Sequence, residues 1–185
     1  FMKYIFGLIS FIILNHSAIA QNNTNMVSLY NADSTLVGIG VLRNGAMEGL
    51  WKFQNPKTNT LVQTINFSNG KREGVAVSFF ANNNRHVEAE YKENKLTGIY
   101  REYDQAGALK IEMVFNDSIP VGPYKEYYGR VNQPEYFNPR QVKTEGQYLN
   151  GKKNGKWVTF YNNGDLAVVQ NYDNGNIEGP YVEYA

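Results

Sequence analysis

The sequence contains no cysteine and only two histidines among its 185 residues. Without cysteine there is no disulfide to stabilise an exported fold, and no attachment site for the thioether-linked lipid of a bacterial lipoprotein. His86 is the only histidine beyond residue 20, so no cluster of cysteine and histidine can hold zinc or copper. We therefore predict no metal site.

The chain also lacks an excess of charge of either sign, since 18 Lys and Arg face 17 Asp and Glu. Residues 1–20 contain Lys3 and no acid, so the remainder has a net charge of zero. A neutral chain lacks the basic surface expected of a nucleic-acid binder and has no general attraction to anionic lipids. We expect neither nucleic-acid binding nor membrane association. Neither a P-loop nor a Gly-x-Ser-x-Gly motif is present, and no cofactor is expected.

A long apolar run occurs only near the N-terminus. Lys3 precedes a nearly continuous apolar stretch from Tyr4 to Leu14, and Ala18-Ile19-Ala20 follows. This order predicts a signal peptide over residues 1–20, cleaved before Gln21, and hence export to the periplasm, outer envelope or outside. A membrane anchor is the alternative, but the run is shorter than the roughly 20 residues that span a bilayer.

What the chain does contain is an internal repeat marked by glycine. The marker glycines are Gly49, Gly74, Gly98, Gly122, Gly155 and Gly179, separated by 25, 24, 24, 33 and 24 residues. A repeat of this length indicates units that bury their apolar faces by stacking on neighbours. We predict one repeat domain over residues 21–185, with an insertion near residues 129–140.

Each unit has the pattern of β-hairpins. A turn pair precedes each marker glycine: Asn44-Gly45, Asn69-Gly70, Glu93-Asn94, Asp117-Ser118, Asn150-Gly151 and Asn174-Gly175. Asn-Gly favours positive φ at both central positions, which closes two-residue hairpins. A large apolar residue lies two positions before the turn, and most units continue as Gly-x-aromatic-x-x-aromatic. The pattern predicts an all-β fold, an elongated antiparallel meander of stacked hairpins with about a dozen strands.

This pattern resembles the MORN repeat, and more closely its bacterial variant found in YwqK-type antitoxins. Residues 145–157, Glu-Gly-Gln-Tyr-Leu-Asn-Gly-Lys-Lys-Asn-Gly-Lys-Trp, carry the resemblance most plainly, and the likeness extends over about residues 27–185. The resemblance implies a long sheet of stacked hairpins. It transfers no catalytic residue, because the family motif contains none, and we expect no enzymatic activity.

The first aromatic residue after each marker glycine is the main candidate for binding. Stacking should align these residues, which are Trp51, Tyr100, Tyr124, Trp157 and Tyr181, in one row. An exposed row would suit a sugar, a peptide or another protein, whereas a buried row would be the core. The first and second aromatic residues lie three positions apart, so strict alternation puts one set on each face of the sheet.

Glutamates recur with the repeat as well. Glu48, Glu73 and Glu178 precede marker glycines, whereas Glu102, Glu126 and Glu183 precede second aromatic residues. A carboxylate pair can hydrolyse glycosides, but an active site would interrupt the repeat in one place. We interpret these residues as cross-strand charge partners.

The insertion is where the repeat is interrupted. It contains Pro134, Tyr136, Phe137 and Pro139. Loops on rigid scaffolds often carry function, so we look for a specific site between this loop and Tyr124, Tyr127 and Tyr128. An excursion packed by its own aromatic residues is the other interpretation.

Together these features predict an exported, non-enzymatic binding or scaffold protein for another macromolecule of the cell envelope. The candidate contact residues are Trp51, Tyr100, Tyr124, Tyr127, Tyr136, Phe137, Trp157 and Tyr181. The alternative that the resemblance suggests is an antitoxin or immunity-like inhibitor of a toxin.

Overall fold

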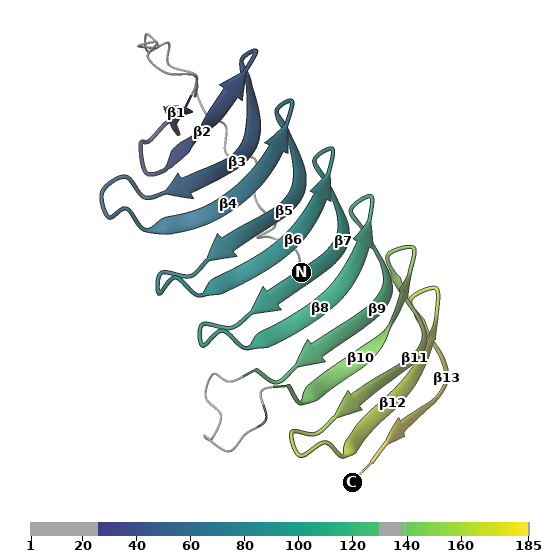
Figure 1. Cartoon of the computed structure of the whole chain (residues 1–185). Coiled ribbons are helices and arrows are strands. Elements are labelled where there is room, and N and C mark those ends of the chain that lie inside the picture. The colour runs from purple at the N-terminus through teal and green to yellow at the C-terminus, as the bar shows by residue number, and fades with distance from the viewer. Residues whose placement is uncertain (1–25, 130–137, 139, 185) are drawn as a thin grey trace.

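The computed structural model describes residues 26–129, 138 and 140–184. These residues form 13 strands in one antiparallel sheet, whose spatial order is the order along the chain (Figure 1). The predicted all-β meander of about a dozen strands is therefore confirmed. No helix among the described residues is long and apolar enough to cross a membrane. The predicted signal peptide, residues 1–20, lies outside the described residues, and export stays a prediction.

Most strands have seven to nine residues, and all pair with their sequence neighbours. Their bounds are β1 Met26–Tyr30, β2 Val37–Arg43, β3 Ala46–Gln54, β4 Leu61–Ser68, β5 Lys71–Phe79, β6 Arg85–Lys92, β7 Lys95–Tyr103, β8 Leu109–Asn116, β9 Ile119–Tyr127, β10 Val142–Leu149, β11 Lys152–Phe160, β12 Leu166–Asp173 and β13 Asn176–Glu183. The predicted insertion lies between β9 and β10.

The predicted two-residue turns have the expected backbone. In each of the six turn pairs both residues have positive φ, for example 49° at Asn150 and 81° at Gly151. The pairs without glycine do the same, with 49° at Glu93 and 71° at Asn94. Positive φ at both positions gives the turn the same twist as the flanking strands, so each hairpin closes without splaying.

Each marker glycine forms a β-bulge, which the sequence pattern did not reveal. Around Gly74, Ile65 pairs with Ala76 and Phe67 pairs with Arg72, so four steps on β5 face two steps on β4. The same excess of two residues occurs at all six marker glycines. Gly74 has a φ of 82°, a region that residues with a Cβ rarely adopt.

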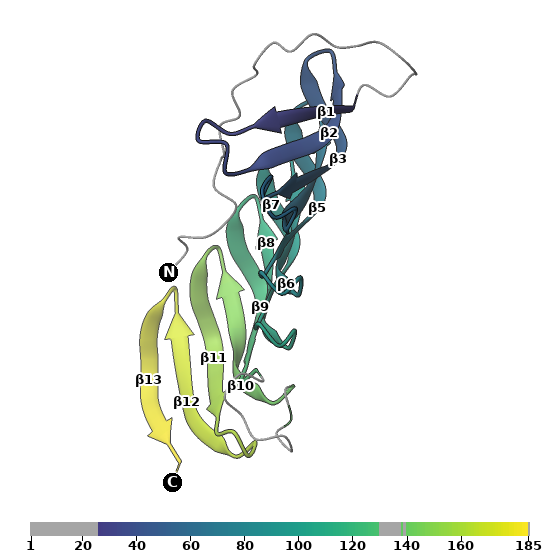
Figure 2. The same cartoon turned by 90° about the vertical axis from the view of Figure 1, so that its left-hand side faces the viewer.

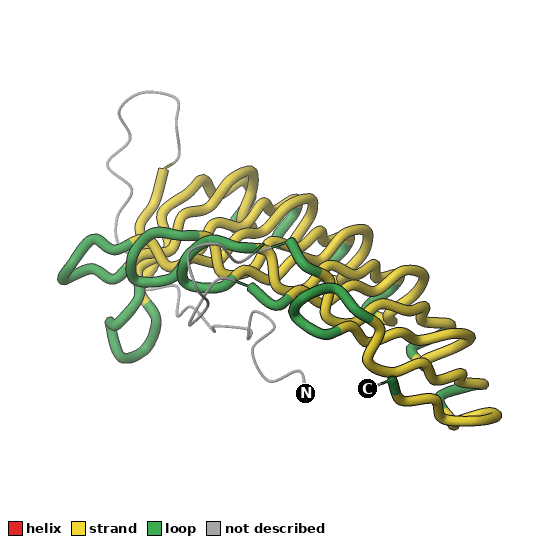
Figure 3. Tube along the Cα trace, turned by 90° about the horizontal axis from the view of Figure 1, so that it is seen from below, coloured by secondary structure: helices red, strands yellow, loops and turns green. Residues whose placement is uncertain are grey.

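A smaller bulge lies near the other end of each unit. Glu102 pairs with Ile111 and Tyr103 with Leu109, which leaves Lys110 as one extra residue on β8. Bulges bend strands and increase their right-handed twist. Figure 2 shows the strand direction turning steadily between β1 and β13, and Figure 3 shows the hairpins following one another as a row of similar loops.

One face of the sheet, here called the inner face, carries a continuous row of core residues. Reading from β3 to β9, Trp51 pairs with Ile65, Ile65 with Ala76, Ala76 with Ala89, Ala89 with Tyr100, Tyr100 with Met113 and Met113 with Tyr124. The row changes in size along its length: Ala76 and Ala89 lie side by side at its centre, with Trp51 and Ile65 before them and Tyr100, Met113 and Tyr124 after them. These side chains pack the buried side of the single sheet.

The two tryptophans show the same arrangement. A Cβ on Gly40 would overlap the Trp51 ring, and a Cβ on Gly146 would overlap the Trp157 ring. The Trp51 Nε1–H donates to the Val41 carbonyl, and the Trp157 Nε1–H donates to the Gln147 carbonyl, each at 3.2 Å. Each indole therefore lies flat on a glycine of the preceding strand.

Further aromatic rings continue the core toward the C-terminus. The ring centroid of Trp157 lies 5.3 Å from that of Tyr124, 5.2 Å from that of Tyr148 and 6.2 Å from that of Tyr172. The Lys153 ammonium lies 4.1 Å from the Trp157 ring centroid. Burial lowers the pKa of Lys153, and the ring faces offset part of the cost of desolvating this charge.

Candidate functional site

In the units from β5 to β11 the second aromatic residue points to the opposite, outer face of the sheet, whereas Phe53 of β3 lies beside Trp51 in the inner core. Tyr103 and Tyr127 lie two positions after Arg101 and Lys125, and these two basic residues belong to the charged outer face. The tyrosines are half-buried, as are the equivalent Phe79 on β5 and Phe160 on β11. An aromatic side chain therefore recurs on the outer face at every second strand from β5 to β11.

A ladder of alternating charges crosses the outer face beside this aromatic row. In strand order from β6 to β10, its members are Glu88, Arg101, Glu112, Lys125 and Glu145. The Arg101 Nε lies 2.7 Å from Glu112 and its Nη1 lies 3.4 Å from Glu88, while Lys125 lies 3.4 Å from Glu145. Three carboxylates and two basic groups leave the ladder with a single net negative charge, and their ion pairs fix the side-chain positions.

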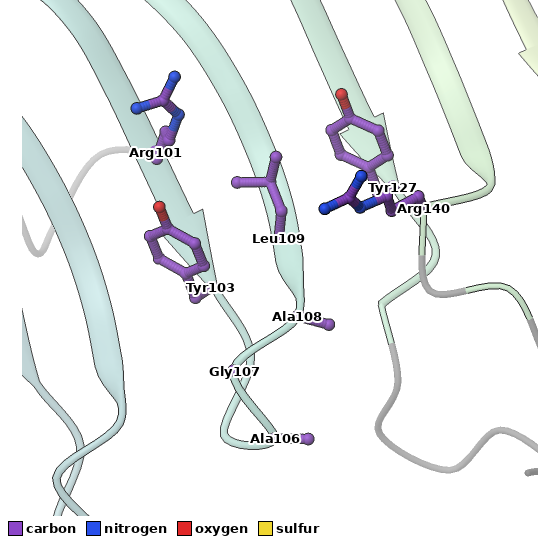
Figure 4. Close-up of a pocket in the computed structure, with 8 residues that line it drawn as sticks. All are labelled: Arg101, Tyr103, Ala106, Gly107, Ala108, Leu109, Tyr127 and Arg140. Atoms are coloured by element: carbon purple, nitrogen blue, oxygen red, sulfur yellow. The ribbon is translucent and has the colours of Figure 1, made fainter.

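A pocket of about 560 Å³ opens where the aromatic row meets the flank of the insertion. Leu109 of β8 lies between Tyr103 of β7 and Tyr127 of β9, and the Arg140 guanidinium lies beside Tyr127 (Figure 4). Arg101 and the turn residues 106–108 complete the lining. The hollow arises because leucine is shorter than the two tyrosines on either side.

The side chains in this pocket offer hydrogen-bond donors and apolar surface. Two guanidinium groups and two phenolic hydroxyls can donate, and none of the described lining residues carries a carboxylate or a side-chain amide. Ala108 and Leu109 supply apolar surface between them. This composition suits a ligand that is rich in hydrogen-bond acceptors and has a flat or apolar body.

The predicted row of first aromatic residues lies on the inner face. Trp51 is fully buried and Trp157 is 4% exposed, so both belong to the core and neither ring is open to a partner. For these two residues the interpretation as an exposed recognition row is wrong, because neighbouring strands cover them.

Tyr100 and Tyr124 are half-buried members of the same inner row. Burial raises the pKa of both hydroxyls, and the carboxylates of Glu102 and Glu126 add to the effect. Their phenols therefore stay neutral at physiological pH, as expected for residues packed mainly against apolar neighbours.

The other predicted contact residues have different surroundings. Tyr127 lines the pocket, at the flank of the insertion where a specific site was predicted. Tyr128 donates from its hydroxyl to the Phe160 carbonyl at 2.7 Å, which ties the start of the insertion to β11. Tyr181 is 58% exposed on β13. Tyr136 and Phe137 lie outside the described residues.

Sequence reasoning missed Arg101, Tyr103, Leu109 and Arg140 as pocket residues. Tyr103 is the second aromatic residue after Gly98, and strict alternation predicts that the second aromatic residues face away from the first ones. Leu109 carries no comparable signal, since only the strand register brings it to Tyr103. Arg140 lies at the end of the predicted insertion, beside which a site was expected, but nothing in the sequence distinguished it from the rest of the loop.

The recurring glutamates have structural partners. Glu48 accepts a hydrogen bond from the backbone N–H of Asn69 at 2.9 Å, and Glu73 accepts one from Glu93 N–H at 2.9 Å. Each carboxylate thus holds the turn of the following hairpin. Among the described residues, no group of three or more His, Asp or Glu side chains is placed to hold a metal ion.

Comparison with known families identifies the repeat. Residues 96–117 and 153–174 match the family described as MORN repeat variant. These two segments are MORN-type repeats. The two matched segments span β7–β8 and β11–β12, and the remaining hairpins share their turns and bulges.

Other comparisons add little. A search of curated proteins found no match. Among solved structures, "Crystal Structure of TarM" matches with a TM-score of 0.36 and 13% sequence identity. That match covers 70% of this chain and 20% of the TarM chain, and at such a score it carries no argument.

Proposed function

We propose that this MORN-repeat protein is an exported, non-catalytic binding module that contacts another macromolecule of the cell envelope through its outer face. MORN-type repeats are commonly binding or scaffold modules, which is compatible with this role. The observation that supports the outer face is the pocket between Tyr103 and Tyr127, because the first aromatic row is largely committed to the core.

The surroundings of the pocket favour recognition over chemistry. Large aromatic and arginine side chains dominate binding energies at interfaces, and here two of each line a single hollow. The charge ladder beside it pairs Arg101 with Glu88 and Glu112, which holds this part of the surface in one arrangement. A rigid surface loses less entropy when it binds a partner.

Site-specific crosslinking tests this proposal. A photoreactive amino acid in place of Ala106, an exposed turn residue at the edge of the pocket, should capture a partner from envelope extracts, and the double variant Tyr103→Ala with Tyr127→Ala should lose it. Tyr181→Ala is the matched control, because Tyr181 is an exposed tyrosine of β13 outside the pocket. Equal recovery by the pocket variant and the control would contradict a role for this surface.

Export is tested separately. The chain is expressed with residues 1–20 intact, and mass spectrometry determines the N-terminus of the product in each cell fraction. We expect a mature chain that begins at Gln21 outside the cytoplasm. A full-length product confined to the cytoplasm would contradict the proposed export.

A further inference from the structure

The spacing and chemistry of the outer aromatic row identify the kind of partner that fits the pocket. We infer that the outer face binds a proline-rich segment in the polyproline II conformation that carries an acidic residue. This inference rests on the proposed binding function and specifies the ligand of the same pocket.

The first argument is the repeat distance. Tyr103 and Tyr127 lie on β7 and β9, two strands apart, and neighbouring strands are about 4.8 Å apart, so the row repeats about every 9.6 Å. A polyproline II helix has three residues per turn and rises about 3.1 Å per residue, which gives about 9.3 Å per turn. A ligand that crosses the strands can therefore place every third residue beside successive aromatic rings.

The row continues beyond the pocket in both directions. Phe79 on β5 and Phe160 on β11 occupy the equivalent positions, so four rings follow one line across seven strands. Three intervals of about 9.6 Å correspond to roughly nine residues of polyproline II. The apolar floor between Tyr103 and Tyr127 is Leu109, and Val142 pairs with Tyr127 on the far side.

The second argument is hydrogen-bond complementarity. Proline has no N–H, so a proline-rich chain presents carbonyl acceptors and almost no donors. The pocket presents the opposite, with donors on Arg101, Arg140, Tyr103 and Tyr127 and no carboxylate or amide side chain among its described lining residues. An ordinary extended peptide would bring its own N–H groups into this site, where the two phenolic oxygens are the acceptors among the described lining side chains. Proline-rich segments in the polyproline II conformation are recognised by aromatic-lined grooves.

The third argument is charge complementarity at the rim. Arg140 is exposed, and no ion pair among the described residues includes its guanidinium. Arg101, in contrast, already contacts Glu88 and Glu112. A carboxylate on the ligand would therefore find its partner at Arg140, where a planar guanidinium can bind both oxygens.

Fluorescence anisotropy with a labelled peptide of nine residues, Glu between two runs of four prolines, tests the inference directly. We expect saturable binding, and a matched peptide with glycine in place of proline should bind at least about tenfold more weakly, because it must lose more backbone entropy.

Tyr103→Ala and Tyr127→Ala should each weaken binding about tenfold or more, whereas Tyr181→Ala should not. Leu109→Trp, which fills the hollow from its floor, should abolish binding without removing any donor.

Arg140→Gln separates the charge from the groove. Arg140→Gln should weaken binding of the peptide that carries glutamate. A peptide with glutamine in place of this glutamate should bind the unchanged protein more weakly, and Arg140→Gln should leave its affinity unchanged. No saturable binding, equal affinity for the proline and glycine peptides, or unchanged affinity of both tyrosine variants would overturn the inference. If the peptide fails while the crosslink at Ala106 still depends on Tyr103 and Tyr127, the ligand class is wrong and the proposed function stands. If both fail, both are wrong.

Discussion

Gly146 is the most direct test of how the inner row is packed, because alanine there should be harmful for one reason only. Its backbone does not have the positive φ of the marker glycines, so alanine can adopt it without strain. Gly→Ala at such a position usually stabilises a protein by about 0.4–1 kcal/mol through the unfolded state. Here, however, the added Cβ would overlap the indole of Trp157.

The expected net effect of Gly146→Ala is destabilising. Forcing an extra carbon into a packed core costs about 1–3 kcal/mol. Displacing the ring also breaks the 3.2 Å bond from Trp157 Nε1–H to the Gln147 carbonyl, which contributes about 1 kcal/mol. After the gain in the unfolded state is subtracted, the free energy of unfolding should fall by about 1–3 kcal/mol.

A second substitution should recover part of this loss. The pair Ala89–Tyr100 shows that alanine and tyrosine fit together at the equivalent place in another unit. We therefore expect Gly146→Ala with Trp157→Tyr to be less destabilising than the sum of the two single variants, by about 1 kcal/mol or more.

Urea unfolding followed by far-UV circular dichroism measures these free energies, since Trp157→Tyr alters the fluorescence signal. The slopes must be compared as well as the midpoints, because repeat arrays can lose cooperativity. Gly155→Ala is the matched control: it has a φ of 68° and open space around its Cβ position, so its cost comes from the backbone and should not depend on Trp157→Tyr. A neutral Gly146→Ala, or single effects that add within about 0.5 kcal/mol, would refute the packing argument.

Three further predictions concern stability. Burial raises the pKa of Tyr91 to about 12, which favours the neutral phenol in the folded state. The contribution of Tyr91 to the free energy of unfolding is therefore fully present below pH 10, and about 3 kcal/mol is lost as the pH rises from 10 to 12. The free energy of unfolding of Tyr91→Phe should lack this pH-dependent component. Glu112→Gln removes one ion-pair partner of Arg101 at a partly exposed site. The free energy of unfolding should therefore change by less than about 1 kcal/mol, and the change should be smaller in high salt. Asn150→Ala, at a φ of 49°, should cost about 1 kcal/mol in thermal unfolding, and a neutral result would contradict the turn assignment.

Local chemistry made the hairpins predictable. Asn-Gly pairs favour positive φ at both positions, and Glu93-Asn94, aligned with them by the repeat, adopts the same geometry. The marker glycines could be located from their spacing, but their bulges could not be predicted. A bulge with two extra residues is defined by how two strands pair, for example four steps on β5 against two on β4. In the sequence of a single strand its only sign is a glycine.

The candidate site was only partly predictable, for a related reason. The three-residue spacing between Tyr100 and Tyr103 correctly placed them on opposite faces, but it did not say which face would be buried. Trp51 and Trp157 settle this in the structure, because each needs a glycine on the preceding strand to receive its ring. Leu109 becomes a neighbour of Tyr103 through the register alone, whereas Arg140 lies at the end of the predicted insertion.

The inner and outer faces differ in how freely their residues can change. On the inner row the side chains of neighbouring strands lie against one another, and the largest of them, such as Trp157, lies on a glycine of the preceding strand, Gly146. On the outer face, solvent covers one side of each residue, and Tyr103 or Tyr127 can vary without displacing a neighbour. A repeat array of this kind can therefore keep one packed core row while the outer row acquires the side chains that a particular partner requires.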